Sequence, residues 1–334
     1  MPPPLESVLR DPRDRPLLVQ VLKSSVLLPS AVAVFVAAQL GPWPFAVAAA
    51  VHLTAYLVHL EAFITLFHDV NHHPLFHRRY AWANAWLVWV YGVTFGCTPH
   101  TYHAHHVLMH HPANNLEGDA SSTLPYQRDS IRDFIRYYLR FFVSLGAVRD
   151  YLATHFPRKR ALRLRLLGGE FGYWAVVALL AAWSPLATLV TLIFPVWLTR
   201  SLLIVGNWGE HAFVDPAAPE DPYRNSTDLI GSTFNDRAFN VGYHIGHHLR
   251  PSAHFSTQPE WFERNVRTYG ERDAVVFRDL HYPHVWWWLM TGRYDRLADH
   301  FVQLPGAPVR SRDQVVAMLR SRVVPIQVTP ADSP

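Results

Sequence analysis

Residues 41–72 read GPWPFAVAAAVHLTAYLVHLEAFITLFHDVNH. The apolar part, about residues 45–67, is close to the ~20 residues that a helix needs to cross ~30 Å of hydrocarbon. An uncharged turn precedes it, and a cluster rich in histidine ends it. The stretch therefore predicts a membrane-spanning helix that carries several imidazoles to one face of a bilayer.

Four stretches have the length and composition of membrane spans, and two uncharged turns, Gly41 to Pro44 and Ser184-Pro185, join them in pairs. We therefore expect an all-α, integral membrane fold, with four transmembrane helices in two hairpins and a cytoplasmic helical cap that carries the histidines. The chain is expected to form a single domain, residues 1–334. The predicted spans cover about residues 17–40, 45–67, 171–183 and 185–205, and the cytoplasmic part covers about residues 68–170 and 207–334.

Two further segments are apolar on one side. Tyr80 to Gly96 is rich in tryptophan but short for a span, which predicts an interfacial or re-entrant helix. Asp129 to Tyr151 alternates aromatic residues with arginine, which is typical of a helix that lies in the headgroup region.

The composition supports a membrane protein with a large polar part. Half of the 334 residues are hydrophobic and 17% are charged, against about a quarter in soluble proteins. The single cysteine, Cys97, excludes a disulfide framework, a cysteine zinc site and a cysteine-ligated iron–sulfur cluster. The basic residues form short clusters beside apolar segments and no nucleic-acid stripe. Arginine-rich, alanine-rich composition is typical of GC-rich bacterial genomes.

The charges also predict the topology. Both interhelical turns are uncharged, whereas the N-terminal region and the cluster Arg158 to Arg165 are basic. Because cytoplasmic segments carry the excess of Lys and Arg, we expect the turns outside and both termini inside, in a bacterial inner (plasma) membrane.

The 21 histidines stand out, and their spacing matters more than their number. Residues three or four apart share a helix face, so His68 and His72, His106 and His110, and His244 with its two partners are each expected to face a common point. A fourth element, Asn207-Trp208-Gly209-Glu210-His211, ends the last span. The clusters themselves are His68-Asp69-Val70-Asn71-His72-His73, His106-Val107-Leu108-Met109-His110-His111 and His244-Ile245-Gly246-His247-His248.

About nine imidazoles exceed what one ion needs, so two metal ions are the economical interpretation. Two zinc ions would satisfy the count equally well. A metal pair beside apolar spans indicates oxidation of an apolar substrate, which favours iron because zinc has no redox chemistry.

Two registers stay open. His72 and His73 compete in the first cluster, and His100, His103 or His105 could replace His106 in the second. His52 and His59 lie seven apart inside a predicted span, where they either line a substrate tunnel or pack between helices.

These residues resemble the histidine boxes of the membrane fatty acid desaturase superfamily, which includes stearoyl-CoA desaturases and bacterial acyl-lipid desaturases. The family shows HxxxH, then HxxHH or HxxxHH, then HxxHH, with paired spans around them. The resemblance covers roughly residues 20–300. It implies a di-iron centre that activates O₂ and introduces a C=C bond into an acyl chain, with no catalytic residue beyond the metal ligands.

The resemblance also implies the ligand set and its surroundings. Asn207 would lie near one iron through water. Asp69 and Glu210 would orient imidazoles, or they are ordinary solvated acids. The implied ligands are His68, His72 (or His73), His106, His110, His111, His211, His244, His247 and His248.

Two other functions compete with a desaturase. The Asn-x-x-Glu-His segment resembles bacterial alkane hydroxylases, so a hydroxylase or ketolase of an alkyl or terpenoid substrate is the alternative. A metal-transporting or metal-storing membrane protein is more distant, because the boxes flank the spans. The expected substrate is an acyl lipid or an acyl thioester, on CoA or carrier protein. Electrons would come from a separate ferredoxin, rubredoxin or cytochrome b5-like donor, and Arg158 to Arg165 would either dock it or anchor to anionic lipid.

Overall fold

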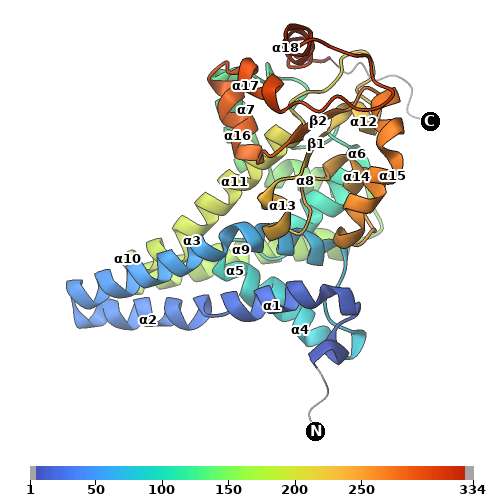
Figure 1. The fold of residues 1–334 in the computed structure, drawn as a ribbon. Helices are drawn as coiled ribbons and strands as arrows, with labels where there is room; N and C mark the ends of the chain where they lie inside the picture. The colour runs from blue at the N-terminus through green and yellow to red at the C-terminus, as the bar shows by residue number, and fades with distance from the viewer. Residues whose placement is uncertain (1–4, 328–334) are drawn as a thin grey trace. The chain divides into compact units, whose positions relative to one another are not determined.

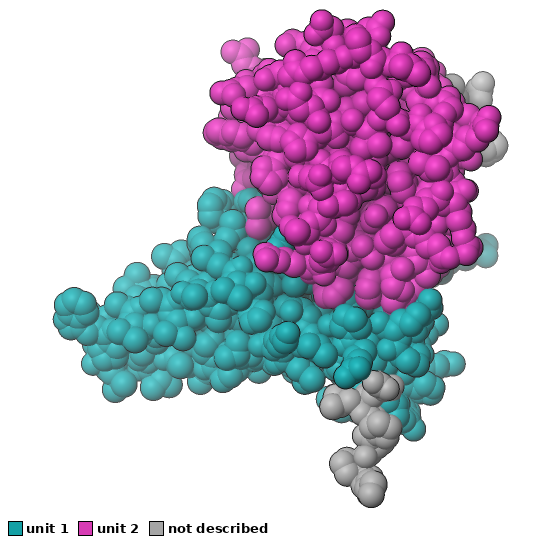
Figure 2. Space-filling model, viewed as in Figure 1, with its two compact units in different colours: residues 1–107, 149–201 teal, residues 108–148, 202–334 magenta. Residues whose placement is uncertain are grey.

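The computed structural model describes residues 5–327, and side chains from residue 7. The extreme ends, which belong to the predicted cytoplasmic termini, lie outside the described residues. The chain forms two compact units: residues 1–107 with 149–201, and residues 108–148 with 202–334 (Figure 2). The expectation of a single domain stays a prediction.

Almost all of unit 1 is helical (Figure 1). Three helices begin in one unit and end in the other: η5 (His103–His110), α8 (Leu145–His155) and α11 (Phe194–Glu210). The elements within unit 1 are η1 (Leu5–Val8), η2 (Pro12–Asp14), α1 (Arg15–Ser24), α2 (Leu27–Leu40), α3 (Pro42–His72), η3 (Arg78–Tyr80), α4 (Ala81–Trp86), the π-helix η4 (Leu87–Tyr91), α5 (Gly92–Thr94), α9 (Arg160–Trp183), α10 (Pro185–Thr188) and the π-helix η6 (Leu189–Ile193).

Four helices are long and apolar enough to cross a membrane, which confirms the all-α membrane fold. They are Pro12–Leu40, Pro42–His72, Arg160–Trp183 and Pro185–Glu210. Each contains one predicted span. The third helix begins eleven residues earlier than its predicted span, and the second runs on to His72. Gly41 permits the sharp turn of the first hairpin, since its φ of 120° is one that side chains disfavour.

Polar contacts join the first hairpin. Ser30 Oγ on α2 lies 2.8 Å from His52 Nδ1 on α3, and Gln20 Nε2 on α1 lies 3.3 Å from His59 Nδ1. His52 is fully buried. These contacts favour packing between helices over the lining of a tunnel for the two histidines.

A loop at residues 95–101 leads into the second histidine cluster, and the second hairpin holds it on both sides. A Cβ on Gly169 of α9 would collide with the Pro99 carbonyl oxygen, and one on Gly96 would collide with Pro195. Glu170 also accepts hydrogen bonds from the hydroxyls of Thr98 and Thr101.

Glu170 forms a buried ion pair in this hairpin. Arg200 Nη2 donates to Glu170 Oε1 at 2.9 Å, and Trp174 Nε1 donates to the same oxygen at 2.9 Å. The Glu170 side chain is 6% exposed. Both charges lie inside candidate spans, where an unpaired charge is costly. The pair therefore fixes the loop before the second cluster to the second hairpin.

Unit 2 packs short helices around one small sheet. Strands β1 (Thr227–Ile230) and β2 (Val275–Arg278) pair in parallel, with Thr227 opposite Val275. The other elements are α6 (His111–Ala113), α7 (Ile131–Phe142), α12 (Pro222–Asn225), α13 (Thr233–Arg237), α14 (His244–Leu249), η7 (Phe255–Thr257), α15 (Gln258–Glu271), α16 (Tyr282–Met290), α17 (Tyr294–His300) and α18 (Arg312–Ser321).

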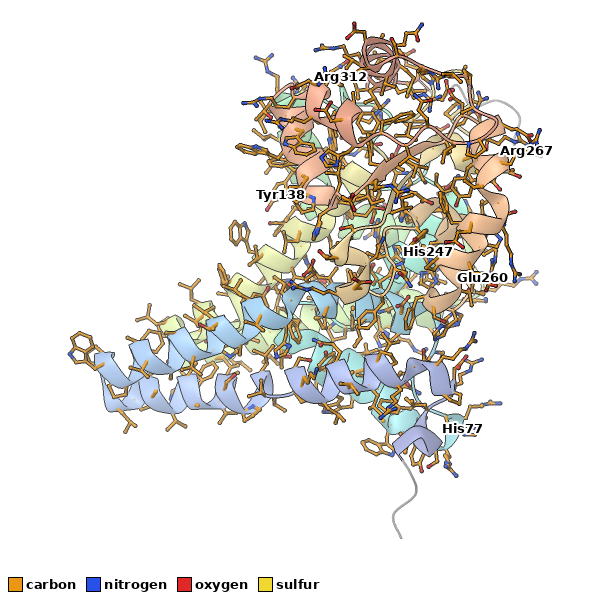
Figure 3. The ribbon with its side chains drawn as sticks, viewed as in Figure 1. His77, Tyr138, His247, Glu260, Arg267 and Arg312 are labelled. Carbon is orange, nitrogen blue, oxygen red and sulfur yellow. The ribbon has the colours of Figure 1, made fainter. Side chains whose placement is uncertain are left out.

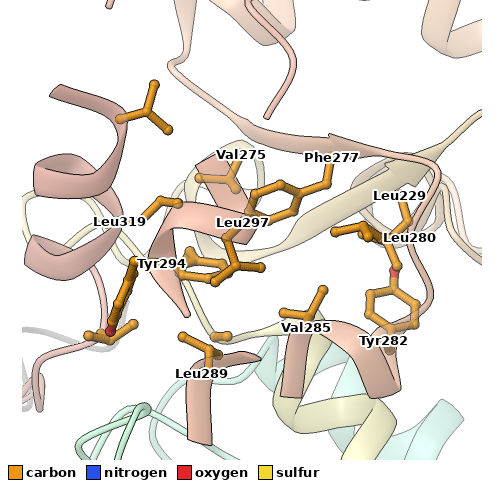
Figure 4. Packing of buried hydrophobic residues seen from close by; sticks show 14 of the residues in the cluster. Leu229, Val275, Phe277, Leu280, Tyr282, Val285, Leu289, Tyr294, Leu297 and Leu319 are labelled. Atoms are coloured by element: carbon orange, nitrogen blue, oxygen red, sulfur yellow. The ribbon is translucent and has the colours of Figure 1, made fainter. Parts of the chain in front are cut away.

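The core of unit 2 lies on the sheet. Phe277, Val285 and Leu297 are fully buried in one cluster with their neighbours from α16, α17 and α18 (Figure 4). This cluster holds β1, whose Asp228 Oδ1 accepts a 2.6 Å hydrogen bond from the Ile245 amide at the start of α14. On its other side α14 lies close to α15, because a Cβ on Gly246 would lie 2.7 Å from Gln258 Oε1. The third histidine cluster is thus held from two sides.

Two details differ from the sequence expectation. The predicted amphipathic segment Asp129 to Tyr151 consists of two helices, α7 and α8 (Leu145–His155), with a break between them. Tyr80 to Gly96 contains one continuous helix, residues 81–94, made of α4, η4 and α5, and its middle part η4 is a π-helix.

Candidate metal centre

Unit 1 brings together three imidazoles. His68 and His72 lie one turn apart at the end of α3, with ring centroids 4.9 Å apart. His106 comes from the π-helix η5 (His103–His110), and its ring lies 4.6 Å from His68 and 5.1 Å from His72. One nitrogen from each residue lies within 4.8 Å of the others. We call these residues the unit-1 triad.

The neighbours of His106 fix its position. His103 Nδ1 donates to the carbonyl oxygen of Asn71 at 3.2 Å, which ties the start of η5 to the end of α3. Tyr102 stacks on His106 with centroids 5.1 Å apart. Of the four histidines that competed in this cluster, His106 is therefore the one that the structure places in the triad.

Unit 2 brings together four more imidazoles, which we call the unit-2 quartet: His110, His211, His244 and His248. Their ligand nitrogens lie within 4.8 Å of one another. His110, His211 and His244 are at most 2% exposed. His211 Nε2 and His244 Nε2 are 3.3 Å apart, which matches two nitrogens at about 2.1 Å from one ion.

Outer partners orient two of these rings. His110 Nδ1 lies 2.7 Å from Asp119 Oδ2, and His211 Nδ1 lies 2.9 Å from the carbonyl oxygen of Asn225. Both partner atoms are oxygens that can only accept a hydrogen bond, so the Nδ1 of each ring must carry the hydrogen. In each ring Nε2 is therefore the nitrogen that is left to bind a metal. His248 Nε2 is also buried there, with no hydrogen-bond partner among the described residues.

Electrostatics keep two rings of the quartet, His211 and His248, neutral. Burial lowers the pKa of His211 to about 3, and burial with the neighbouring histidines lowers the pKa of His248 well below its usual value. Burial alone would also lower the pKa of His110, but the Asp119 carboxylate outweighs it and raises that pKa. Neutral imidazoles are the form that binds metals.

A further pair lies in unit 2. His247 Nε2 is 2.9 Å from His111 Nε2 (His247 is labelled in Figure 3). The expectation that each cluster faces one common point holds for His68 and His72 in the first cluster and was wrong for the second and third clusters. His106 and His110 belong to different groups, and so do His247 and His248. Successive helix residues point about 100° apart, so one short cluster serves two groups.

The remaining assigned residues differ in what they contact. His73 lies just after α3, in extended backbone, and does not belong to the triad, which favours His72. Asp69 Oδ1 is 3.5 Å from His68 Nδ1. Glu210 Oε2 is 3.7 Å from His244 Nε2, the nitrogen that faces His211. Glu210 thus approaches the ligand side of the ring, which is where a carboxylate ligand would lie.

Asn207 supports the quartet indirectly. Its Nδ2 donates to the Ser121 carbonyl oxygen at 3.0 Å and to Tyr137 Oη at 2.8 Å. Ser121 in turn donates its hydroxyl to Asp119 Oδ1 at 2.7 Å. The expected place of Asn207 near an iron stays a prediction. The role of all these histidines as metal ligands also stays a prediction.

Sequence reasoning missed Asp119 and Asn225. Asp119 follows the second cluster by eight residues in a loop, and an acid near a histidine cluster is a usable signal because metal-bound histidines often donate to carboxylates. Asn225 acts through its backbone oxygen on His211. No sequence pattern predicts a contact with a backbone oxygen of this kind.

The residues present fit a metal centre. A buried group of four imidazoles in which His211 is neutral and His248 Nε2 has no hydrogen-bond partner among the described residues is unfavourable without a cation. The set is imidazole, with Glu210 beside it, which suits iron, copper, nickel or zinc.

Comparison with known families agrees with this chemistry. The family model described as fatty acid desaturase matches residues 41–281, more than two thirds of the chain. The chain belongs to the fatty acid desaturase family. The matched residues of this desaturase-family protein include the triad, the quartet and the pair His111 and His247. No curated protein and no solved structure matches the chain.

Proposed function

We propose that this protein is an O₂-dependent desaturase of fatty acyl chains that uses two iron ions. The family match supports an oxidation of this type. The observation that carries the proposal is the unit-2 quartet, a buried group in which partners on Nδ1 leave the Nε2 atoms of His110 and His211 to bind a metal.

The proposed ions divide between the groups. The unit-1 triad would hold one iron and the unit-2 quartet the other, with His111 and His247 as further ligands. When bound, such an iron pair supplies the redox chemistry that zinc lacks. The overall reaction balances when O₂ takes two electrons and two protons from the substrate C–H bonds, two electrons from a donor and two protons from the solvent. Two water molecules and one C=C bond result.

The chain's own residues set the conditions for this chemistry. Asp119 and Asn225 hold two rings in the ligating tautomer, and Asn207 braces the loop that carries Asp119. Burial of His110, His211 and His244 limits the access of water. Apolar spans beside the groups suit an acyl substrate, delivered as an acyl lipid or as an acyl thioester.

The electron donor would be a separate protein of the ferredoxin, rubredoxin or cytochrome b5 type. We propose that it docks on the cluster Arg158 to Arg165, of which Arg158, Lys159, Arg160 and Arg165 are exposed. Opposite charge on the donor would speed the encounter. By the positive-inside rule this cluster and both termini would face the cytoplasm of a bacterium.

The test is expression in a host with a simple lipid profile, with candidate donors supplied, followed by mass spectrometry of the lipids. We expect new acyl chains lighter by two hydrogens. The His248→Ala variant should abolish them, whereas His77→Ala, an exposed histidine outside the groups, should not. A gain of one oxygen would instead identify a hydroxylase. If the iron-loaded, reduced protein gave no product at all, the result would contradict both the desaturase and the hydroxylase hypotheses.

A further inference from the structure

The outer face of α7 carries an exposed aliphatic stripe. Ile131, Ile135, Leu139 and Val143 follow one another at steps of four and are 51%, 51%, 60% and 75% exposed. Residues four apart lie on one side of a helix. Trp287 on α16 adds a ring that is 58% exposed. An exposed apolar stripe of this kind marks an interaction site.

The inner face of α7 shows where the stripe lies. Phe134 and Tyr137 are buried against Ile204 and Trp208 of α11 (Phe194–Glu210), with the Tyr137 and Trp208 rings 4.8 Å apart. Trp286 packs on Phe134 from α16, with ring centroids 5.0 Å apart. The helix α7 is thus fixed to the last turns of the fourth candidate span.

The length of the fourth candidate span indicates the level of α7 relative to the hydrocarbon core of the membrane. Pro185–Glu210 has 26 residues, or about 39 Å of helix, whereas the hydrocarbon core is ~30 Å thick. Asn207 and Glu210 mark the polar end. The turns that contact α7 therefore lie where the helix leaves the hydrocarbon, at the level of the lipid headgroups.

Charge completes the pattern. Arg132, Arg136 and Arg140 each follow a residue of the stripe by one position, so they lie about 100° round the helix from it, and all three are exposed. Arg136 reaches Asp133 at 2.9 Å in an exposed pair, which contributes little to stability. A row of cations beside an apolar stripe matches a surface with anionic headgroups above acyl chains.

We propose that α7, together with Trp287, is a docking surface for the anionic leaflet of the membrane. The stripe inserts among the acyl chains beside the headgroups, and the three arginines bind lipid phosphates. This contact does not depend on the proposed reaction, since it rests on α7, α11 and α16 alone.

The test uses the whole protein in vesicles. Cys97 is buried and is replaced in a Cys97→Ser background. A fluorophore is attached at Ile135→Cys or Leu139→Cys on the stripe, and at Arg264→Cys as a matched control. Arg264 lies on α15 of the same unit, a helix that exposes no large hydrophobic residue among those described. We expect a headgroup-level doxyl lipid to quench the two stripe labels, and aqueous iodide to quench only the control.

The anionic requirement is tested with the same labels. Vesicles of phosphatidylcholine and phosphatidylglycerol are compared with phosphatidylcholine alone. Doxyl quenching at Leu139→Cys should fall without the anionic lipid, and the combined Arg132→Gln, Arg136→Gln and Arg140→Gln variant should remove that difference. Iodide quenching of the stripe labels equal to that of the control would overturn the proposal. Equal doxyl quenching in both vesicles would overturn its anionic part.

Discussion

At the level of single residues, Asp119 decides how His110 faces the quartet. It is buried, and besides His110 it accepts the amides of Asn115 and Ser121 at 3.1 and 2.8 Å. We expect Asp119→Asn to lower the metal affinity of the protein about 10–100-fold, because such outer partners fix the tautomer of a ligand. Competition with a chelator measures this affinity. Asp299→Asn, at an exposed pair with Arg312, serves as the control. Equal affinities in the two variants would refute the role of Asp119.

Asp228 predicts a pH dependence of stability. Its full burial raises the pKa of its carboxyl to about 7, against 3.8 normally. The folded state therefore holds a proton that the unfolded state releases between these values, so this residue makes stability fall as pH rises from about 4 to 7. The variant Asp228→Asn cannot ionise and keeps the acceptor for Ile245. Its melting temperature, measured without metal, should rise relative to wild type across this window. A constant difference would contradict this assignment.

At the level of elements, the pair of Glu170 and Arg200 joins the second hairpin to the loop before η5. We expect Glu170→Gln to destabilise the protein by about 3–5 kcal/mol, because it leaves the Arg200 charge without its buried counterion. The same substitution at Glu260, in an exposed pair with Arg264, should cost less than about 1 kcal/mol. Denaturant unfolding in detergent compares them. Restoration of stability by a second substitution, Arg200→Gln, would support the pairing, and similar losses at both sites would exclude it.

The second hairpin also shows which features of the spans hydropathy can predict and which it cannot. Length and apolar composition locate the four spans because every membrane helix must meet that requirement. The third predicted span begins eleven residues after its helix does, since Glu170 and several arginines lower the mean hydropathy of the first half of that helix. The partner of Glu170, Arg200, lies thirty residues further along the chain. The π-helices η4, η5 and η6 have no sequence signature of this kind. Their hydrogen-bond pattern depends on packing.

At the level of the whole molecule, the histidine spacing predicted which residues gather but not how they divide. Box spacing places His68 beside His72 on any helix. His110 and His111, like His247 and His248, point apart because neighbours on a helix differ by about 100°. Which group each ring joins depends on tertiary packing that the spacing does not describe. Asn225 was out of reach for the same reason, since it contacts His211 through its backbone oxygen, whereas Asp119 could have been found as an acid near the second cluster.

Metal binding should stabilise the whole fold, because the quartet joins the end of α11, α14 and the segment around His110. A ligand that binds only the native state adds about 2.7 kcal/mol at a concentration 100 times its dissociation constant. We expect Fe²⁺ and Zn²⁺ both to raise the melting temperature of chelator-treated protein, and His244→Ala to reduce both shifts. Only the iron-loaded protein should consume O₂ when reduced, since zinc has no redox chemistry. If neither ion shifted the melting temperature of the wild type, the buried imidazoles would have to be explained as packing alone.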